Sequence, residues 1–199
     1  TNKVLWSVEH SEPLAGGPTL IGNKGVLVTD IDGSTLAFSL NNGALVWQTS
    51  GLPADTVVLG SGAPAVHKGT VIVAGIGGEI SANAVADGSL LWADSLATLA
   101  PRTPLEELGD ILANPVHDGD AVYVVSQSGL LGAFDPLTGI QLWEQPISSI
   151  QTPWVAGESL FVLTTSSHLV ALRKSDGAVR WYTDLPGSAE LAAISATDV

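Results

Sequence analysis

Tryptophan recurs along this chain at a nearly constant spacing, and most copies close the same five-residue unit, Gly-x-x-x-Trp. Successive copies are 41, 45, 51 and 38 residues apart, counted from a half-copy near the start. The repeat residues are Trp6, Trp47, Trp92, Trp143 and Trp181, with Gly43, Gly88, Gly139 and Gly177. A period of about 40–50 residues is typical of a four-stranded propeller blade. The spacing therefore predicts an all-β propeller of about four antiparallel blades.

Each copy carries the elements of a blade in the same order. It opens with Pro and an apolar residue, passes through a Gly turn into an apolar strand, and reaches the Gly-x-x-x-Trp strand after two more turns. Asp-Gly, Asn-Gly and Thr-Gly pairs favour such tight turns. The predicted blades are residues 18–49, 64–95, 115–146 and 153–184, with 1–9 as the closing strand of a preceding blade and 185–199 as the start of a following segment.

The longest spacing, before Trp143, marks an insertion between the second and third blades. Its best helix signal runs from Thr103 to Leu112, where Thr103 can cap and Glu106 follows three residues later. We expect a long loop with no more than one helical turn.

A single blade cannot bury both of its faces, so blades must stack on their neighbours. A Trp on the last strand is large enough to fill the wedge between two blades. Four blades and an orphan strand do not close a ring by themselves. We therefore expect part of a larger propeller, completed by further blades or by a second copy.

Composition excludes several classes of function. The formal charge is -13, from 7 basic and 20 acidic residues, and such a surface repels nucleic acid and anionic lipid. The chain has no cysteine, which excludes a disulfide, a thiolate nucleophile and a Cys-based zinc site. No apolar run approaches the roughly 20 residues of a membrane helix, so we expect membrane attachment only through an anchor outside this chain.

The third copy, Ala133-Phe-Asp135-Pro-Leu-Thr138-Gly139-Ile-Gln-Leu-Trp143, resembles the repeat of pyrroloquinoline quinone (PQQ)-like propellers. The other copies carry Ser39, Ala86 and Arg173 in place of the Asp. The resemblance covers nearly the whole chain, but several functional families share this repeat.

Within that group, the chain most resembles the BamB family, the propeller lipoproteins of the bacterial β-barrel assembly machinery. The resemblance lies in the two approaches to the second and third blades, Val57–Pro64 and Glu107–Pro115. Residues 151–164 are similar to α-proteobacterial members. This resemblance implies an eight-bladed ring, of which the chain would form about half.

The BamB resemblance implies a non-catalytic scaffold in the periplasm, associated with the outer membrane. The implied partner is the POTRA region of BamA, the barrel-forming subunit. The residues that the resemblance assigns to docking are Thr56, Val58 and Leu59 in one inter-blade loop, and Asp110 and Leu112 in the next. Leu59 stands where the family has a basic residue and Leu112 where it has an acid, which departs from the family pattern. The resemblance implies no catalytic residue, cofactor or metal.

Two other functions stay open. PQQ-dependent dehydrogenases share the Trp repeat, so the chain is alternatively a fragment of such a quinoprotein. The absence of cysteine argues against this, because the resemblance would imply a vicinal disulfide over the cofactor. The third interpretation is a ligand-sensing propeller.

Two motifs suggest metal sites but have simpler interpretations. Asp30-Ile-Asp32-Gly33-Ser34 resembles the start of a calcium loop, but residues 35–47 supply no acid, so we predict a β-hairpin turn. His67 and His117 occupy the same position before the Gly of their turns. Equivalent positions should lie one blade apart, so we expect two separate polar turns and no shared site.

Overall fold

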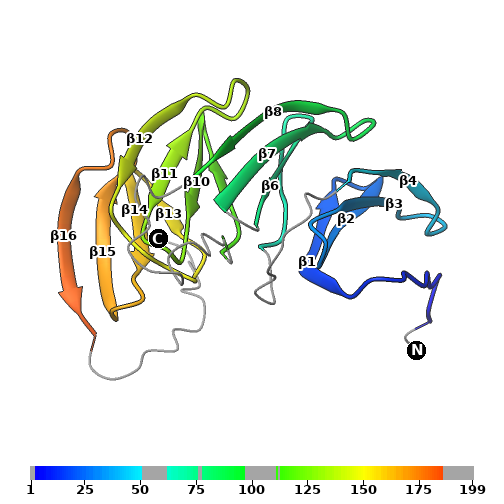
Figure 1. The fold of residues 1–199 in the computed structure, drawn as a ribbon, viewed down its shortest axis with the longest axis horizontal. Coiled ribbons are helices and arrows are strands. Elements are labelled where there is room, and N and C mark those ends of the chain that lie inside the picture. The colour runs from blue at the N-terminus through cyan, green and yellow to red at the C-terminus, as the bar shows by residue number, and fades with distance from the viewer. Residues whose placement is uncertain (1–2, 51–61, 76–77, 97–110, 112, 186–199) are drawn as a thin grey trace.

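The computed structural model describes residues 3–50, 62–75, 78–96, 111 and 113–185. These residues form four antiparallel sheets of four strands each, in the order β1-β2-β3-β4 and its three repeats. The sheets follow one another around an arc, from β1–β4 beside the N-terminus to β13–β16 at the other end (Figure 1). The predicted all-β propeller class, with about four blades, is confirmed.

The strands of the first two blades are β1 Leu14–Ile21, β2 Gly25–Asp30, β3 Thr35–Ser39, β4 Leu45–Gln48, β5 Ala65–His67, β6 Thr70–Ala74, β7 Glu79–Ala84 and β8 Leu90–Ser95. Those of the last two are β9 Val116–Asp118, β10 Ala121–Val125, β11 Leu131–Phe134, β12 Gln141–Gln145, β13 Trp154–Ala156, β14 Ser159–Leu163, β15 His168–Arg173 and β16 Val179–Asp184. The predicted helical turn at 103–112 lies almost wholly outside the described residues.

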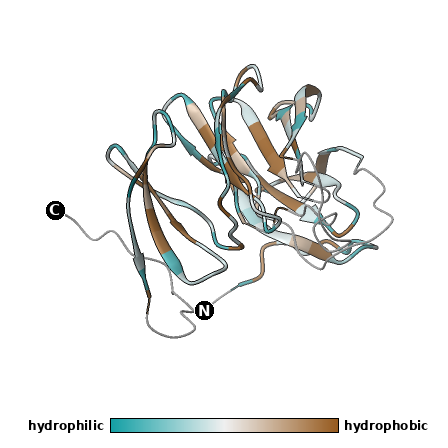
Figure 2. Ribbon diagram, turned by 60° about the vertical axis from the view of Figure 1, so that its left-hand side comes forward, coloured by the Kyte–Doolittle hydropathy of each residue, from teal (hydrophilic) through white to brown (hydrophobic). Residues whose placement is uncertain are grey.

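The middle strands of the blades form the core, most completely in the third blade, which has a described blade on each side. Every residue of β10 and β11 is buried, whereas β16 is exposed along its whole length. Figure 2 shows brown apolar segments along the strands and teal at many turns. This pattern of burial on both faces is typical of stacked sheets.

The first strands of the blades lie closest to the propeller axis. β5 contacts β1 on one side and β9 on the other, and β9 also contacts β13. Because neighbouring strands in each blade are antiparallel, the first turn and the last hairpin lie at one end of the blade. The second turn and the connection to the next blade lie at the opposite end.

The repeated Trp residues join each blade to the next. Trp47 Nε1 donates to the Val85 carbonyl at 2.9 Å, and the indole ring packs on Gly88. The equivalent pairs are Trp6 with Leu40 and Gly43, Trp92 with Pro136 and Gly139, and Trp143 with Lys174 and Gly177. In every case the acceptor carbonyl lies three residues before the Gly. We call this pair of contacts the Trp–Gly lock.

The lock explains why the repeat requires Gly. Gly88 has φ +74, and a Cβ there would lie 2.7 Å from the Trp47 ring. An L-residue would therefore be strained by its backbone and would also collide with the indole. Each copy of the motif therefore takes part in two contacts between blades. Its Gly packs against the Trp of the preceding copy, and its own Trp contacts the following blade.

The two ends of the array differ: the N-terminal end carries a complete lock, and the C-terminal end shows half of one. Residues 3–10 form no strand in this structure, yet Trp6 still docks on the first blade. At the other end, Trp181 is 46% exposed and lies beside Phe161 of its own blade, with ring centroids 5.9 Å apart. The proposal that a further blade covers Trp181 rests on this exposure and on the repeated geometry of the other locks.

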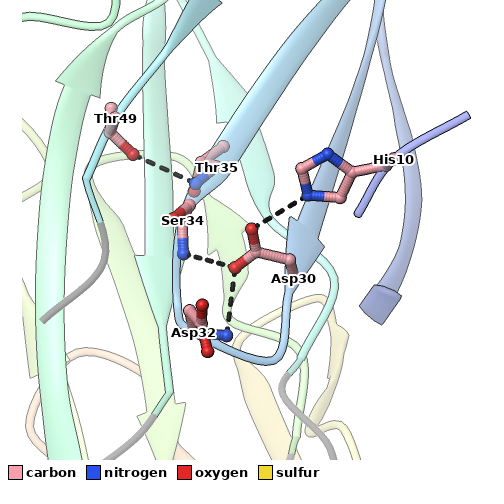
Figure 3. Close-up of polar contacts among 6 residues, drawn as sticks. All are labelled: His10, Asp30, Asp32, Ser34, Thr35 and Thr49. Atoms are coloured by element: carbon pink, nitrogen blue, oxygen red, sulfur yellow. Dashed lines mark hydrogen bonds and ion pairs between the residues drawn. The ribbon is translucent and has the colours of Figure 1, made fainter. Parts of the chain in front are cut away.

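The hairpin prediction for the segment Asp30–Ser34 is confirmed, since β2 ends at Asp30 and pairs antiparallel with β3. Asp30 is 2% exposed and organises the turn. Its Oδ1 accepts hydrogen bonds from the Asp32 and Ser34 amides at 3.1 and 2.8 Å (Figure 3). Its Oδ2 lies 3.2 Å from His10 Nε2, which ties the N-terminal segment to the first blade.

The Asp of the third copy has a local structural role. Asp135 Oδ1 accepts hydrogen bonds from the Leu137 and Thr138 amides, at 2.8 and 2.9 Å. These amides lower the pKa of the Asp135 carboxyl, because they stabilise its ionised form. The structure also corrects the alignment of the second copy. The residue equivalent to Asp135 is Ala84 and not Ala86, because Ala84 accepts the Gly88 amide as Asp135 accepts that of Gly139.

Candidate functional site

The predicted docking residues Thr56, Val58, Leu59, Asp110 and Leu112 lie outside the described residues. The structure does describe the ends of the two loops that carry them. One loop ends at Gly62 and leads into β5, and the other ends at Ala113 and leads into β9. The geometry of these ends decides whether the two loops belong to one surface.

The two loop ends are in direct contact. The Ala63 amide donates to Asn114 Oδ1 at 2.7 Å, across 51 residues of sequence. Gly62 approaches the Ala113 carbonyl so closely that an added Cβ would clash with that oxygen. The role of Gly62 is to allow this close approach of two backbones, because it carries no Cβ.

The second loop is also fixed just before its end. Ile111 is fully buried and packs in the core cluster shared by the second and third blades. Its amide donates to the Gly75 carbonyl at 2.9 Å. Ile111 lies between the predicted docking residues Asp110 and Leu112, so this point of the loop is anchored to the second blade.

Similar ties continue along the same end of the array. Thr19 Oγ1 donates to the Pro64 carbonyl at 2.7 Å, and the Asn114 amide donates to Thr152 Oγ1 at 3.2 Å. Each tie joins the approach to one blade with the first strand or the approach of its neighbour. The result is a continuous rim of polar contacts at the ends of the innermost strands. Sequence reasoning missed these residues, because none carries a signature until its partner is known.

His67 and His117 lie in separate hairpins of two blades, but the prediction that this separation keeps them apart is wrong. Their rings stack with centroids 3.3 Å apart and an interplanar angle of 14°. The two residues are one blade apart in the repeat, but β5 and β9 are neighbouring innermost strands, and blades converge toward the axis. Side chains of neighbouring first strands can therefore touch near the axis, and His67 meets His117 although they differ by one position in their hairpins. Their shared position before the turn Gly was the signal that could have revealed the contact.

A charged cluster lies at the same end of the blades as the stacked histidines. Lys174 Nζ lies 2.9 Å from Asp118 and 3.7 Å from Glu158, which joins the third and fourth blades. The Asp118 carboxylate, by accepting this hydrogen bond, raises the pKa of Lys174. Nearby, burial raises the pKa of the Tyr123 phenol, which donates to the Lys174 carbonyl at 3.3 Å. Each of these groups is bound to another group of the cluster, so the cluster itself contains no free acid–base pair.

The described residues show packing and polar ties rather than a reaction centre. They contain no cluster of three or more His, Asp or Glu side chains arranged to hold a metal ion. Among these same residues there is also no helix of the length and apolarity that a membrane crossing requires. What this geometry can do is present two adjacent loops on a rigid frame.

Comparison with known proteins identifies the family. The family model described as "Outer membrane protein assembly factor BamB" matches residues 1–183. This chain belongs to the BamB family. A BamB from Yersinia pestis is 30% identical over 182 residues, which cover 90% of this chain and 45% of that protein. The chain thus spans about half the length of the curated BamB relatives that it matches.

Solved structures agree with this assignment. The crystal structure of BamB from Moraxella catarrhalis superposes with a TM-score of 0.80 at 26% identity, covering 90% of this chain and 54% of that one. A quinohemoprotein alcohol dehydrogenase from Comamonas testosteroni superposes with a TM-score of 0.72 at 18% identity. The second likeness shows the propeller fold alone. The predicted BamB resemblance is therefore confirmed, and its relatives are named as assembly factors of the outer membrane.

Proposed function

We propose that this BamB-family chain is a non-catalytic periplasmic scaffold that binds the POTRA region of the barrel-forming subunit BamA. Docking takes place through the two loops that enter the second and third blades, with Thr56, Val58, Leu59, Asp110 and Leu112 as the contact residues. The protein assists outer-membrane protein assembly from a position at the outer membrane.

One observation carries the proposal: the two loops end side by side. The hydrogen bond between Ala63 and Asn114 and the close approach of Gly62 to Ala113 hold their ends together. Burial of Ile111 fixes a third point. Loop ends that are held together bring both loops to one place on the frame, which favours their joint contact with a single partner.

The direct test is a pull-down of the POTRA domains of BamA with this chain and with the double variant Leu59→Asp plus Asp110→Arg. We expect the variant to lower affinity by about tenfold or more, because a few central residues supply most of the binding energy in an interface. Isothermal titration calorimetry would give the change in Kd. Unchanged affinity would remove these loops as the docking site.

The chain offers a matched control on the outer strand of the third blade. Leu142 is 50% exposed, and Glu144 is also exposed, so Leu142→Asp plus Glu144→Arg makes the same chemical changes on β12. We expect this variant to keep its affinity for the POTRA domains. An equal loss in both variants would indicate a general effect of surface charge and would contradict a localised site.

The quinoprotein alternative has its own test. PQQ-dependent dehydrogenases share this fold, so we expect a titration of the chain with PQQ and calcium to separate the two functions. A scaffold gives no saturable quenching of tryptophan fluorescence by PQQ. A quinoprotein gives quenching that depends on calcium and reaches a plateau as PQQ is added. Calcium-dependent saturation would overturn the assignment of a non-catalytic role.

A further inference from the structure

The stacked histidines lie at one end of a short frame whose other end carries the candidate docking loops. His67 is the last residue of β5, and His117 is the middle residue of β9. Each strand has only three residues. At their opposite ends the same two strands follow Ala63 and Asn114, which are joined by a hydrogen bond. The contact between the second and third blades is therefore held at both ends. The hydrogen bond from the Ala63 amide holds one end, and the two stacked imidazole rings hold the other.

The imidazole end is sensitive to charge. In the described structure His117 Nε2 is buried and has no hydrogen-bond partner. A proton on this nitrogen would place a charge where no acceptor compensates it, which is unfavourable. A second positive ring 3.3 Å away would add direct repulsion.

The surrounding charges do not remove this sensitivity. Burial lowers the pKa of His117, and the charges of His67 and Lys68 on the neighbouring blade lower it further. Asp118 and Asp120 beside His117 act in the opposite direction but do not reverse the shift. Asp118 is also shared with Lys174 of the fourth blade, at 2.9 Å.

We propose that the His67–His117 stack is a pH-sensitive latch between the second and third blades. With neutral His117 the rings stack and the latch is closed. Protonation of His117 opposes the stack, loosens the contact between β5 and β9, and frees the loop ends at the other end of these strands. Acid therefore weakens partner docking, a consequence that rests on the proposed function.

The direction of the stability change follows from the lowered pKa of His117. Unfolded His has a pKa of about 6.5 and takes up its proton before the folded form does. Stability is therefore full above about pH 6.5 and is lost as pH falls from there toward the folded pKa of His117. Below the folded pKa both states are protonated and the loss is complete.

The test variant is His117→Phe, which keeps an aromatic ring in the stack and removes both titrating nitrogens. It gives up no hydrogen bond at Nε2, because that atom has none. We expect thermal unfolding of the wild-type chain to lose more Tm between pH 7.5 and 5.0 than the variant does. Amide exchange at Ala63, corrected for intrinsic rates, should lose protection at pH 5.0 only in the wild type.

A matched control is His168→Gln, which removes a half-exposed histidine paired with Asp184 on the last blade. This control should keep the wild-type exchange behaviour at Ala63. Equal pH responses of Tm and exchange in wild type and His117→Phe would overturn the latch. If His117→Phe fails to fold, an NMR titration of wild-type His117 decides instead, and a midpoint at or above about 6.5 would contradict the proposal.

The partner measurement is separate from the latch measurement. POTRA affinity should fall in acid for the wild type and change less for His117→Phe. Absence of binding at neutral pH would contradict the proposed function while leaving the Tm and exchange results to judge the latch. Binding with the same pH dependence in both proteins would contradict the link between latch and docking.

Discussion

Trp92→Ala is expected to destabilise this protein by about 3–5 kcal/mol, the range for removing a large aromatic side chain from a core. Trp92 is only 9% exposed and packs in the cluster shared by the second and third blades. The change also removes the hydrogen bond from its Nε1 to the Pro136 carbonyl, at 3.0 Å. Chemical denaturation followed by circular dichroism would measure the loss.

The repeat supplies a control with the same residue at the equivalent position. Trp181 is 46% exposed and belongs to the last described blade, so Trp181→Ala should cost less than half as much in this chain. An equal cost for both substitutions would contradict the view that Trp acts by docking on the next blade.

The reciprocal half of the lock gives a second comparison. Gly139 has φ +75, and an added Cβ would lie 2.7 Å from the Trp92 ring, so Gly139→Ala should also be strongly destabilising. Gly119 has φ +59 but no atom within 4 Å of an added Cβ. Gly119→Ala should therefore carry only the backbone cost, and the difference between the two variants measures the collision with Trp92.

Asp30→Ala is expected to cost about 2–3 kcal/mol, because it removes the side chain that accepts the amides of the turn, including the amide of buried Ser34. Asp30 is 2% exposed, and its carboxylate receives the Asp32 and Ser34 amides as well as His10. The loss should appear in the denaturation midpoint. It should be accompanied by faster amide exchange at Ser34.

Asp30→Asn is the matched variant, since its side-chain oxygen can still accept the two turn amides at Oδ1. We expect it to retain most of the stability and to lose mainly the charge facing His10. Similar losses in the Ala and Asn variants would show that the charge at Asp30, and not its acceptor role, holds the turn.

Much of the architecture could be predicted because it depends on patterns of residues that are close along the chain. Gly and Asp mark tight turns, β-branched runs mark strands, and a period near that of a blade sets the repeat. The hairpin at Asp30–Ser34 follows from neighbouring residues alone and is confirmed. The long insertion before the third blade has no such pattern, and the docking residues at 56–59 and 110–112 were assigned by family resemblance and stay a prediction.

Contacts between blades could not be predicted in the same way. Trp47 Nε1, for example, donates to the Val85 carbonyl 38 residues away, and nothing in the sequence around Val85 marks it as the acceptor. The need for Gly at position 62 comes from its close contact with the Ala113 carbonyl, and only the structure shows that contact. The sequence places His67 and His117 in turns of two different blades. It does not show how far each turn lies from the propeller axis, and that distance decides whether the two side chains meet.

The sequence by itself determined that this chain folds as repeated four-stranded blades, because hairpin pairing depends on residues that are close along the chain. It also determined that Gly and Trp occur together at a blade-like period. Only the tertiary structure decided what that pairing does: the Gly of one copy receives the Trp of the copy before it. Residues that meet across blades are separated by 31 to 56 residues along the chain, roughly one blade period, and their contact depends on how the sheets stack.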